Sequence, residues 1–153
     1  MTNEHHYSAL LHWQGSTADG YRGYPRGHTV ATPPAAEPLR LSADPAFRGD
    51  AARQNPEQLI VAAASSCLLL MFLGDAARTG IDVREYRDDA VGTLRGGRIA
   101  EIHLRPCIGV AGVDAAHGAA EVERMLRASH EQCYIARSLT SDIVLVPEIE
   151  VLA

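Results

Sequence analysis

The longest hydrophobic run in the chain extends from Leu59 to Leu73 and follows a clear helix start. The start reads Asn55-Pro56-Glu57-Gln58. Asn is a good N-cap, Pro suits the first helical position, and Gln three residues after the cap completes a capping box. Gly80 suits the left-handed position after a helix end. The pattern therefore predicts a helix from about Pro56 to Arg78.

This helix is expected in the core of the protein rather than in a membrane. The apolar run is shorter than the roughly 18 residues that a membrane span needs, and polar Ser65, Ser66 and Cys67 interrupt it. The first residues, 1–6, have neither a basic region nor the apolar stretch of a signal peptide. We therefore expect a cytoplasmic protein that does not associate with membranes.

Alternating and turn-rich segments surround the helix. Strand character in residues 7–14, followed by turn residues 15–27, favours a hairpin or meander. Leu39-Arg40-Leu41 is a strand fragment within a proline-rich stretch. After the helix, two extended segments at 83–95 and 98–110 are separated by Gly96-Gly97, which is typical of a tight hairpin turn.

The second of these extended segments has two different faces. Ile102, Leu104, Ile108 and Val110 fall on one face, and Glu101, His103, Arg105 and Cys107 fall on the other. Helical spacing predicts a second helix from Asp114 to Cys133, and alternation resumes at 143–151. The pattern indicates an α+β fold with antiparallel sheets and two main helices, as a single domain over residues 1–153.

Composition narrows the range of partners. The 153 residues carry a net charge of -5, and all the basic residues are Arg. The chain therefore offers no flexible polybasic patch to nucleic acid or to an anionic membrane. Three cysteines do not form a disulfide scaffold in a chain of this length, so a bond between two of them is expected to be transient and catalytic.

Two of the cysteines, Cys67 and Cys133, lie on the predicted helices. An ordinary thiol is mostly protonated at neutral pH, and burial disfavours the thiolate further, so a reactive thiol needs a nearby cation. Cys67 lies too far along its helix for the helix N-terminus to supply that charge. Arginine suits this role, and Glu57 in the first helical turn is placed to orient a guanidinium.

Two motifs occur together in this chain. The first is Asn55-Pro56-Glu57-Gln58-Leu59 followed by Cys67, and the second is the distal segment His130-Glu131-Gln132-Cys133-Tyr134-Ile135-Ala136-Arg137-Ser138. This combination resembles the OsmC/Ohr family of organic hydroperoxide resistance proteins, over about residues 19–151. The resemblance implies an OsmC-like fold in an intertwined homodimer. It also implies an antioxidant thiol peroxidase that acts on alkyl or fatty acid hydroperoxides in the oxidative stress response, with no metal, haem or flavin cofactor.

The resemblance implies a catalytic role for four residues. Cys67 attacks the peroxide and becomes a sulfenic acid, which condenses with Cys133 to a disulfide that a lipoyl or thioredoxin type of dithiol reduces. Glu57 orients the activating arginine. Arg26, in the segment Gly20–His28, resembles the family's active-site arginine, and Arg22, Arg48 and Arg53 remain alternatives.

Other functions also fit parts of the pattern. Cys67, Cys133 and His130 offer a set of metal ligands. The apolar helix and a dimer groove would also suit a non-enzymatic protein that binds a lipid-like ligand. Cys107 has no partner motif and is interpreted as structural.

Overall fold

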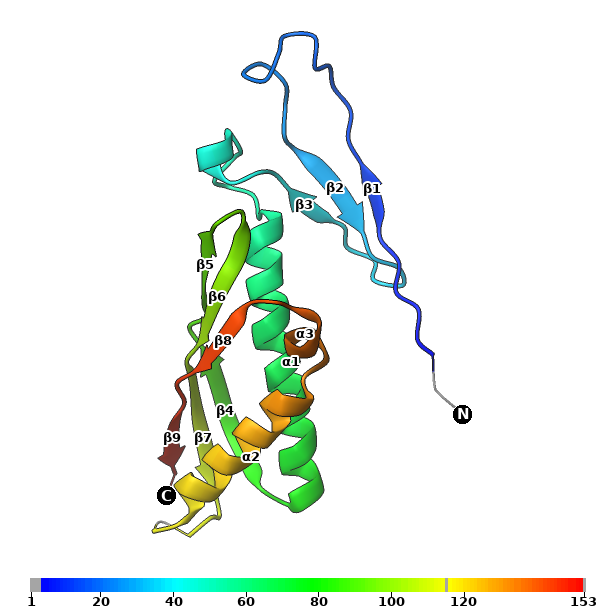
Figure 1. Cartoon of the computed structure of the whole chain (residues 1–153). Helices are drawn as coiled ribbons and strands as arrows, with labels where there is room; N and C mark the ends of the chain where they lie inside the picture. Colours follow the sequence, from blue (N-terminus) through cyan, green and yellow to red (C-terminus); the bar gives the residue numbers. More distant parts are fainter. Residues whose placement is uncertain (1–3, 115, 153) are drawn as a thin grey trace. The chain divides into compact units, whose positions relative to one another are not determined.

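The computed structural model describes residues 4–114 and 116–152, and the chain divides into two units, residues 1–59 and 60–153. The first unit holds a three-stranded antiparallel sheet (Figure 1). Its strands are β1 (Leu10–His12), β2 (His28–Ala31) and β3 (Leu39–Leu41), in that order, followed by the short 3-10 helix η1 (Pro45–Phe47). The predicted meander and the strand fragment at residues 39–41 are therefore confirmed.

Helix α1 spans Pro56–Thr79, within one residue of the predicted end. The capping box is formed as the sequence predicts. The backbone N–H of Gln58 donates to Asn55 Oδ1 at 2.8 Å, and the backbone N–H of Asn55 donates to Gln58 Oε1 at 3.0 Å. Gly80 follows the helix with φ +78°, a conformation that glycine adopts without strain.

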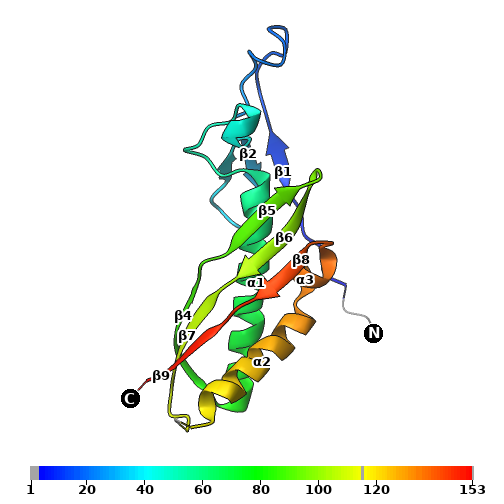
Figure 2. The ribbon, with the colours of Figure 1, turned by 60° about the vertical axis from the view of Figure 1, so that its left-hand side comes forward.

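Two three-stranded sheets form the second unit (Figure 2). Their orders are β4-β7-β9 and β5-β6-β8. The strands are β4 (Asp82–Asp88), β5 (Val91–Arg95), β6 (Arg98–Leu104), β7 (Pro106–Ala111), β8 (Asp142–Leu145) and β9 (Glu148–Val151). The hairpin turn at Gly96-Gly97 joins β5 to β6 as predicted, with positive φ at both glycines.

Each of the two long predicted strands is divided in two. The break comes where the backbone N–H of Arg105 donates to Asp88 Oδ1 at 2.7 Å instead of to a neighbouring strand. Pro106, the next residue, has no N–H to donate. The hairpin therefore passes from one sheet into the other at this point.

The predicted antiparallel pairing is confirmed for β4 with β7 and for β5 with β6, but not for the last two strands. Strand β8 pairs parallel to β6, and β9 pairs parallel to β7, so both sheets are mixed. Helices α2 (Gly118–Gln132) and α3 (Tyr134–Ser138) lie between β7 and β8. Such a helical crossover returns the chain to the end of the sheet where it began, which allows parallel pairing.

Helix α2 begins later than predicted. The carboxylate of Asp114 accepts a hydrogen bond from the backbone N–H of His117 at 3.0 Å, which closes a turn before the helix. Residue 115, which the sequence pattern assigns to this helix, lies outside the described residues. Helix α3 was not predicted.

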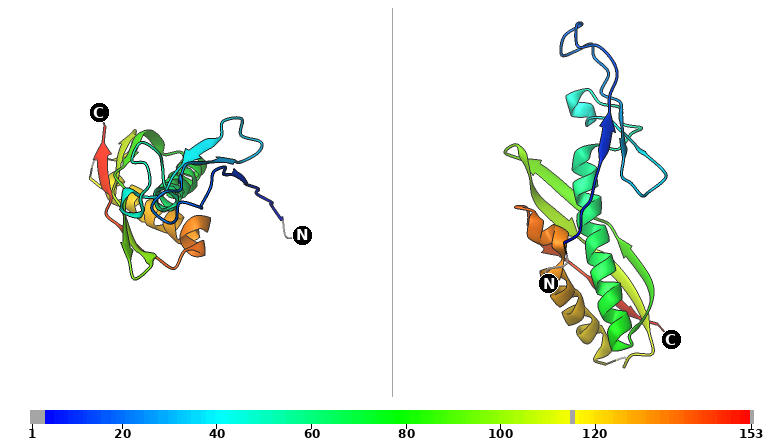
Figure 3. Two further views of the ribbon diagram at one scale, coloured as in Figure 1. Left: turned by 90° about the horizontal axis from the view of Figure 1, so that it is seen from above. Right: turned by 90° about the vertical axis from the view of Figure 1, so that its right-hand side faces the viewer.

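Side chains from both main helices and from the sheets form the core of the second unit. Ile102, Leu104, Ile108 and Val110 are buried, as the alternation predicts. They pack with residues of α1 and α2, which cover one face of the sheets (Figure 3). The helical members of this core are Ala64, Leu68, Phe72, Ala76, Val122 and Leu126.

Helix α1 also has an exposed apolar face. By length and composition alone α1 is able to cross a membrane. Four of its side chains nevertheless belong to the core of the second unit, as expected of a core helix. On another face, Leu70 is 66% exposed and Leu73 is 37% exposed.

Candidate active site

Two thiols from separate elements meet in the second unit. Cys67 lies on α1 and is partly exposed, whereas Cys133 directly follows α2 and is only 1% exposed. Both cysteines are free thiols, and their side chains lie close enough to interact, because Cys67 contributes to the raised pKa of the Cys133 thiol. A disulfide between neighbouring thiols requires Cβ atoms about 3.5–4.5 Å apart.

The position of Cys133 depends on a break between two helices. Its backbone is extended, with φ -62° and ψ 118°, and this ends α2. Its N–H still donates to the carbonyl of His130 at 3.1 Å, and its own carbonyl accepts from the N–H of Arg137 at 3.0 Å. Cys133 is therefore held by backbone hydrogen bonds on both sides.

The surroundings of Cys133 favour its neutral form. Burial raises the pKa of the Cys133 thiol, and its hydrogen bond with Cys67 raises that pKa further. Cys133 consequently remains a thiol at neutral pH. Only the thiolate form of cysteine is a good nucleophile, so the neutral Cys133 thiol reacts poorly with peroxide.

Arg26 and Glu57 line one cavity, which lies within the first unit and has a volume of about 450 Å³. The guanidinium of Arg26 donates to the backbone carbonyls of Tyr21 and Tyr24, and it lies over the Tyr24 ring at 3.7 Å from the centroid. Aromatic side chains also line the cavity, namely Trp13, Tyr24 and Phe47. The cavity is therefore lined by a cation from Arg26, a carboxylate from Glu57 and apolar side chains.

The other candidate arginines have different surroundings. Arg53 forms an ion pair with Asp50 at 3.4 Å. Arg48 ends η1 in a left-handed conformation, with φ 67°, and Arg22 lies on an exposed turn. Of the four candidates, Arg26 lines the cavity that contains Glu57. The assignment of the activating arginine stays a prediction.

The metal alternative has no geometric support in the part of the chain that the structure describes. Within residues 4–114 and 116–152, no group of three or more His, Cys, Asp or Glu side chains is arranged to hold a metal ion. His130 is partly buried, and its burial lowers its pKa, with a smaller opposing effect of Glu131. The imidazole is therefore neutral at physiological pH.

Sequence reasoning missed two polar contacts that anchor α1 on either side of Cys67. Ser65 donates to Asp88 at 2.5 Å, which ties α1 to the end of β4. Ser129 donates to Asp75 at 2.6 Å, which ties α2 to α1. One signal was available, because Ser129 occupies the buried stripe of α2 and a buried hydroxyl needs a partner.

Residues 49–148 match the family model of OsmC-like proteins. This chain belongs to the OsmC-like family. The matched region contains Glu57, Cys67 and Cys133, whereas Arg26 lies before it. The family resemblance noted from the sequence is confirmed. Comparison with curated proteins gave no significant match.

Solved structures of OsmC-like proteins share the fold. An OsmC-like protein of unknown function from Vibrio cholerae is 28% identical, with a TM-score of 0.82 over 94% of this chain and 99% of the other. An organic hydroperoxide resistance protein OsmC from Legionella pneumophila is 16% identical, with a TM-score of 0.65 over 97% and 99%. An organic hydroperoxide resistance protein from Elizabethkingia anophelis is 15% identical, with a TM-score of 0.67 over 99% and 100%.

Proposed function

We propose that this OsmC-like protein is a thiol-dependent peroxidase that reduces organic hydroperoxides through Cys67 and Cys133. The main support is that these two free thiols, one on α1 and one directly after α2, are neighbours whose side chains interact. Membership of the OsmC-like family supports it. Two structural neighbours with the same fold are named as organic hydroperoxide resistance proteins.

The proposed cycle has three balanced steps. The Cys67 thiolate attacks the distal oxygen of the hydroperoxide, so that an S–O bond forms and the O–O bond breaks. The alkoxide takes up the proton that the Cys67 thiol released on ionising, and it leaves as the alcohol. The sulfenic acid then condenses with the Cys133 thiol, which forms the disulfide and releases water. A dithiol reductant returns both cysteines to thiols and itself becomes a disulfide.

The different exposures of the two thiols suit these roles. Cys67 is partly exposed and therefore accessible to a peroxide, whereas Cys133 is buried beside it. The raised pKa of Cys133 keeps it neutral until Cys67 has been oxidised. Only one sulfur of the pair is thus suited to attack the substrate.

We propose that Glu57 and Arg26 act on the Cys67 of a second copy of the chain. Glu57 and Cys67 are ten residues apart on the continuous helix α1. The rise of an α-helix, about 1.5 Å per residue, separates them by about 15 Å along the axis, which is far beyond hydrogen-bonding range. The exposed leucines of α1, Leu70 and Leu73, suit a homodimer interface.

The cavity beside Arg26 and Glu57 supports an organic substrate. Trp13, Tyr24 and Phe47 give it apolar walls that match the alkyl or aryl part of a hydroperoxide. Burying such a group contributes roughly 1.5–3 kcal/mol, which is about 10- to 150-fold in binding. Hydrogen peroxide has no apolar part and gains nothing from these walls.

A comparison of substrates tests this function. With excess dihydrolipoamide as the reductant, kcat/KM for cumene hydroperoxide is expected to exceed that for hydrogen peroxide by at least about tenfold. Trp13→Ala is expected to reduce the value for cumene hydroperoxide and to leave that for hydrogen peroxide unchanged. Consumption of cumene hydroperoxide no faster than in a protein-free control would contradict the proposal.

A further inference from the structure

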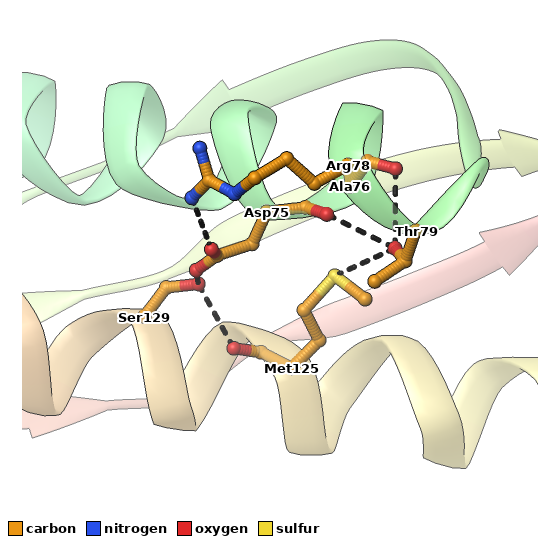
Figure 4. Close-up of polar contacts among 6 residues, drawn as sticks. All are labelled: Asp75, Ala76, Arg78, Thr79, Met125 and Ser129. Atoms are coloured by element: carbon orange, nitrogen blue, oxygen red, sulfur yellow. Dashed lines mark hydrogen bonds and ion pairs between the residues drawn. The ribbon is translucent and has the colours of Figure 1, made fainter.

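Asp75 is a charged residue within the apolar helix α1, and it faces α2 (Figure 4). One carboxylate oxygen accepts a hydrogen bond from Ser129 Oγ at 2.6 Å, and the other accepts from the Arg78 guanidinium at 2.5 Å. The Asp75 side chain is only 24% exposed, and Ser129 is fully buried. The Asp75–Ser129 hydrogen bond is therefore a partly buried contact between the two helices.

The contacts between α1 and α2 follow one seam. Cys67 meets Cys133, Asp75 meets Ser129, and the Thr79 hydroxyl lies 3.9 Å from the sulfur of Met125. Residue numbers rise on α1 as they fall on α2, so the helices run in opposite directions along this seam. Met125 and Ser129 on α2, and Cys133 directly after it, are spaced by four residues, about one helical turn.

We propose that Asp75 is a positioning residue for the thiol pair, because its hydrogen bond to Ser129 fixes the alignment of α1 and α2 at which the sulfurs of Cys67 and Cys133 meet. This role rests on the proposed function only in its consequence for catalysis. The contact itself belongs to the reduced protein and involves no peroxide.

The Asp75–Ser129 hydrogen bond lies close enough to Cys133 on the chain to set the distance between the two thiols. Ser129 is four residues before Cys133, so a shift of α2 at Ser129 is transmitted within one turn to the sulfur. A disulfide requires Cβ atoms about 3.5–4.5 Å apart and a narrow range of dihedral angles. A displacement of about 1 Å therefore moves the pair out of bonding geometry.

The chemistry of the contact makes it a strong one. The Ser129 hydroxyl has a single hydrogen, and the Asp75 carboxylate at 2.6 Å is a better acceptor than the Met125 carbonyl at 3.0 Å. Hydrogen bonds from Ser129 and Arg78 hold the pKa of Asp75 below its usual value. The carboxylate is consequently ionised at neutral pH, and the bond is charge-assisted.

A redox titration in glutathione buffers tests the proposal without any peroxide. Oxidised glutathione takes two electrons from Cys67 and Cys133, which gives the intramolecular disulfide and two reduced glutathione molecules. Asp75→Ala and Ser129→Ala are each expected to reduce the equilibrium constant for this disulfide by about tenfold. That change makes the reduction potential about 30 mV less negative.

Three further variants separate positioning from general stability. Asp75→Asn retains an oxygen that accepts from Ser129, so it is expected to stay close to the wild-type potential. The double variant Asp75→Ala/Ser129→Ala is expected to match either single variant, because both remove the same bond. Ser65→Ala, which removes the bond from α1 to Asp88, is the matched control and is expected to lower Tm without changing the potential.

The outcomes are distinct for the two proposals. Folded Ser129→Ala protein with the wild-type potential, or a double variant whose shift is the sum of both single shifts, would overturn the positioning role. A wild-type protein that forms no Cys67–Cys133 disulfide in any of the buffers would overturn it as well. A protein that shows the expected potentials but consumes no peroxide supports the positioning role and refutes only the peroxidase.

Discussion

The Cys67→Ser variant will lose peroxide consumption, with kcat/KM for cumene hydroperoxide reduced by at least about a thousandfold. A serine hydroxyl is not ionised at neutral pH and cannot form the sulfenic acid on which the cycle depends. The measurement is steady-state consumption of cumene hydroperoxide with dihydrolipoamide as the reductant. Unchanged consumption by the variant would support the alternative of a protein that binds a lipid-like ligand.

The other two cysteines provide matched controls. Cys133→Ser retains the attacking sulfur, so Cys67 is expected to consume one equivalent of peroxide to become a sulfenic acid and a second equivalent to become a sulfinic acid. Cys107 lies on β7, where its sulfur is 3.8 Å from both the Arg87 guanidinium and a Glu150 carboxylate oxygen. Cys107→Ser is expected to keep wild-type activity, because its thiol takes no part in the proposed cycle.

Heterodimers of two inactive variants will recover activity if the site is shared between copies. Glu57→Gln and Cys67→Ser homodimers are each expected to be nearly inactive. In a heterodimer of the two, one site combines an intact Cys67 with the intact Glu57 of the other copy, so about half of the wild-type activity per dimer returns. Heterodimers purified through two different affinity tags are assayed for cumene hydroperoxide consumption.

A second heterodimer gives the opposite result for a site built from one chain. When wild type is paired with the double variant Glu57→Gln/Cys67→Ser, a shared site leaves neither site intact, whereas a site within one chain leaves half of the activity. If the heterodimer of the two single variants is inactive and the heterodimer with the double variant keeps half of the activity, Glu57 acts on the Cys67 of its own chain.

Local features of the fold were predictable because they depend on neighbouring residues. Hydrogen bonds between Asn55 and Gln58 fix the start of α1. Gly96-Gly97 forms the turn between β5 and β6. The buried face of β6 and β7 likewise follows from alternation. Each of these signals lies within a few positions along the chain.

Features that depend on distant residues were not predictable in the same way. The parallel pairing of β8 with β6 depends on the path of the crossover through α2 and α3. The break at Arg105-Pro106 depends on the carboxylate of Asp88, seventeen positions away. The same reason applies to the Asp75–Ser129 contact, because neither residue alone indicates its partner.

The candidate site falls between these cases. Cys67 and Glu57 were singled out from a local motif, whereas their connection with Cys133 and Arg26 came from the family resemblance. The structure adds the contact between Cys67 and Cys133, and the cavity that Arg26 and Glu57 both line. It also adds the interactions of Arg26 with Tyr21 and Tyr24, which no pattern in the sequence indicates.

Mass spectrometry after a single equivalent of cumene hydroperoxide shows directly whether Cys67 and Cys133 are the reacting pair. The reduced protein is mixed with the peroxide, its remaining thiols are alkylated, and the intact mass and the peptide map are measured. We expect the protein to lose two hydrogens, to form a Cys67–Cys133 linkage that a dithiol removes, and to release one equivalent of cumyl alcohol. Full alkylation of both cysteines with the peroxide unconsumed, or a disulfide that involves Cys107 instead, would contradict this expectation.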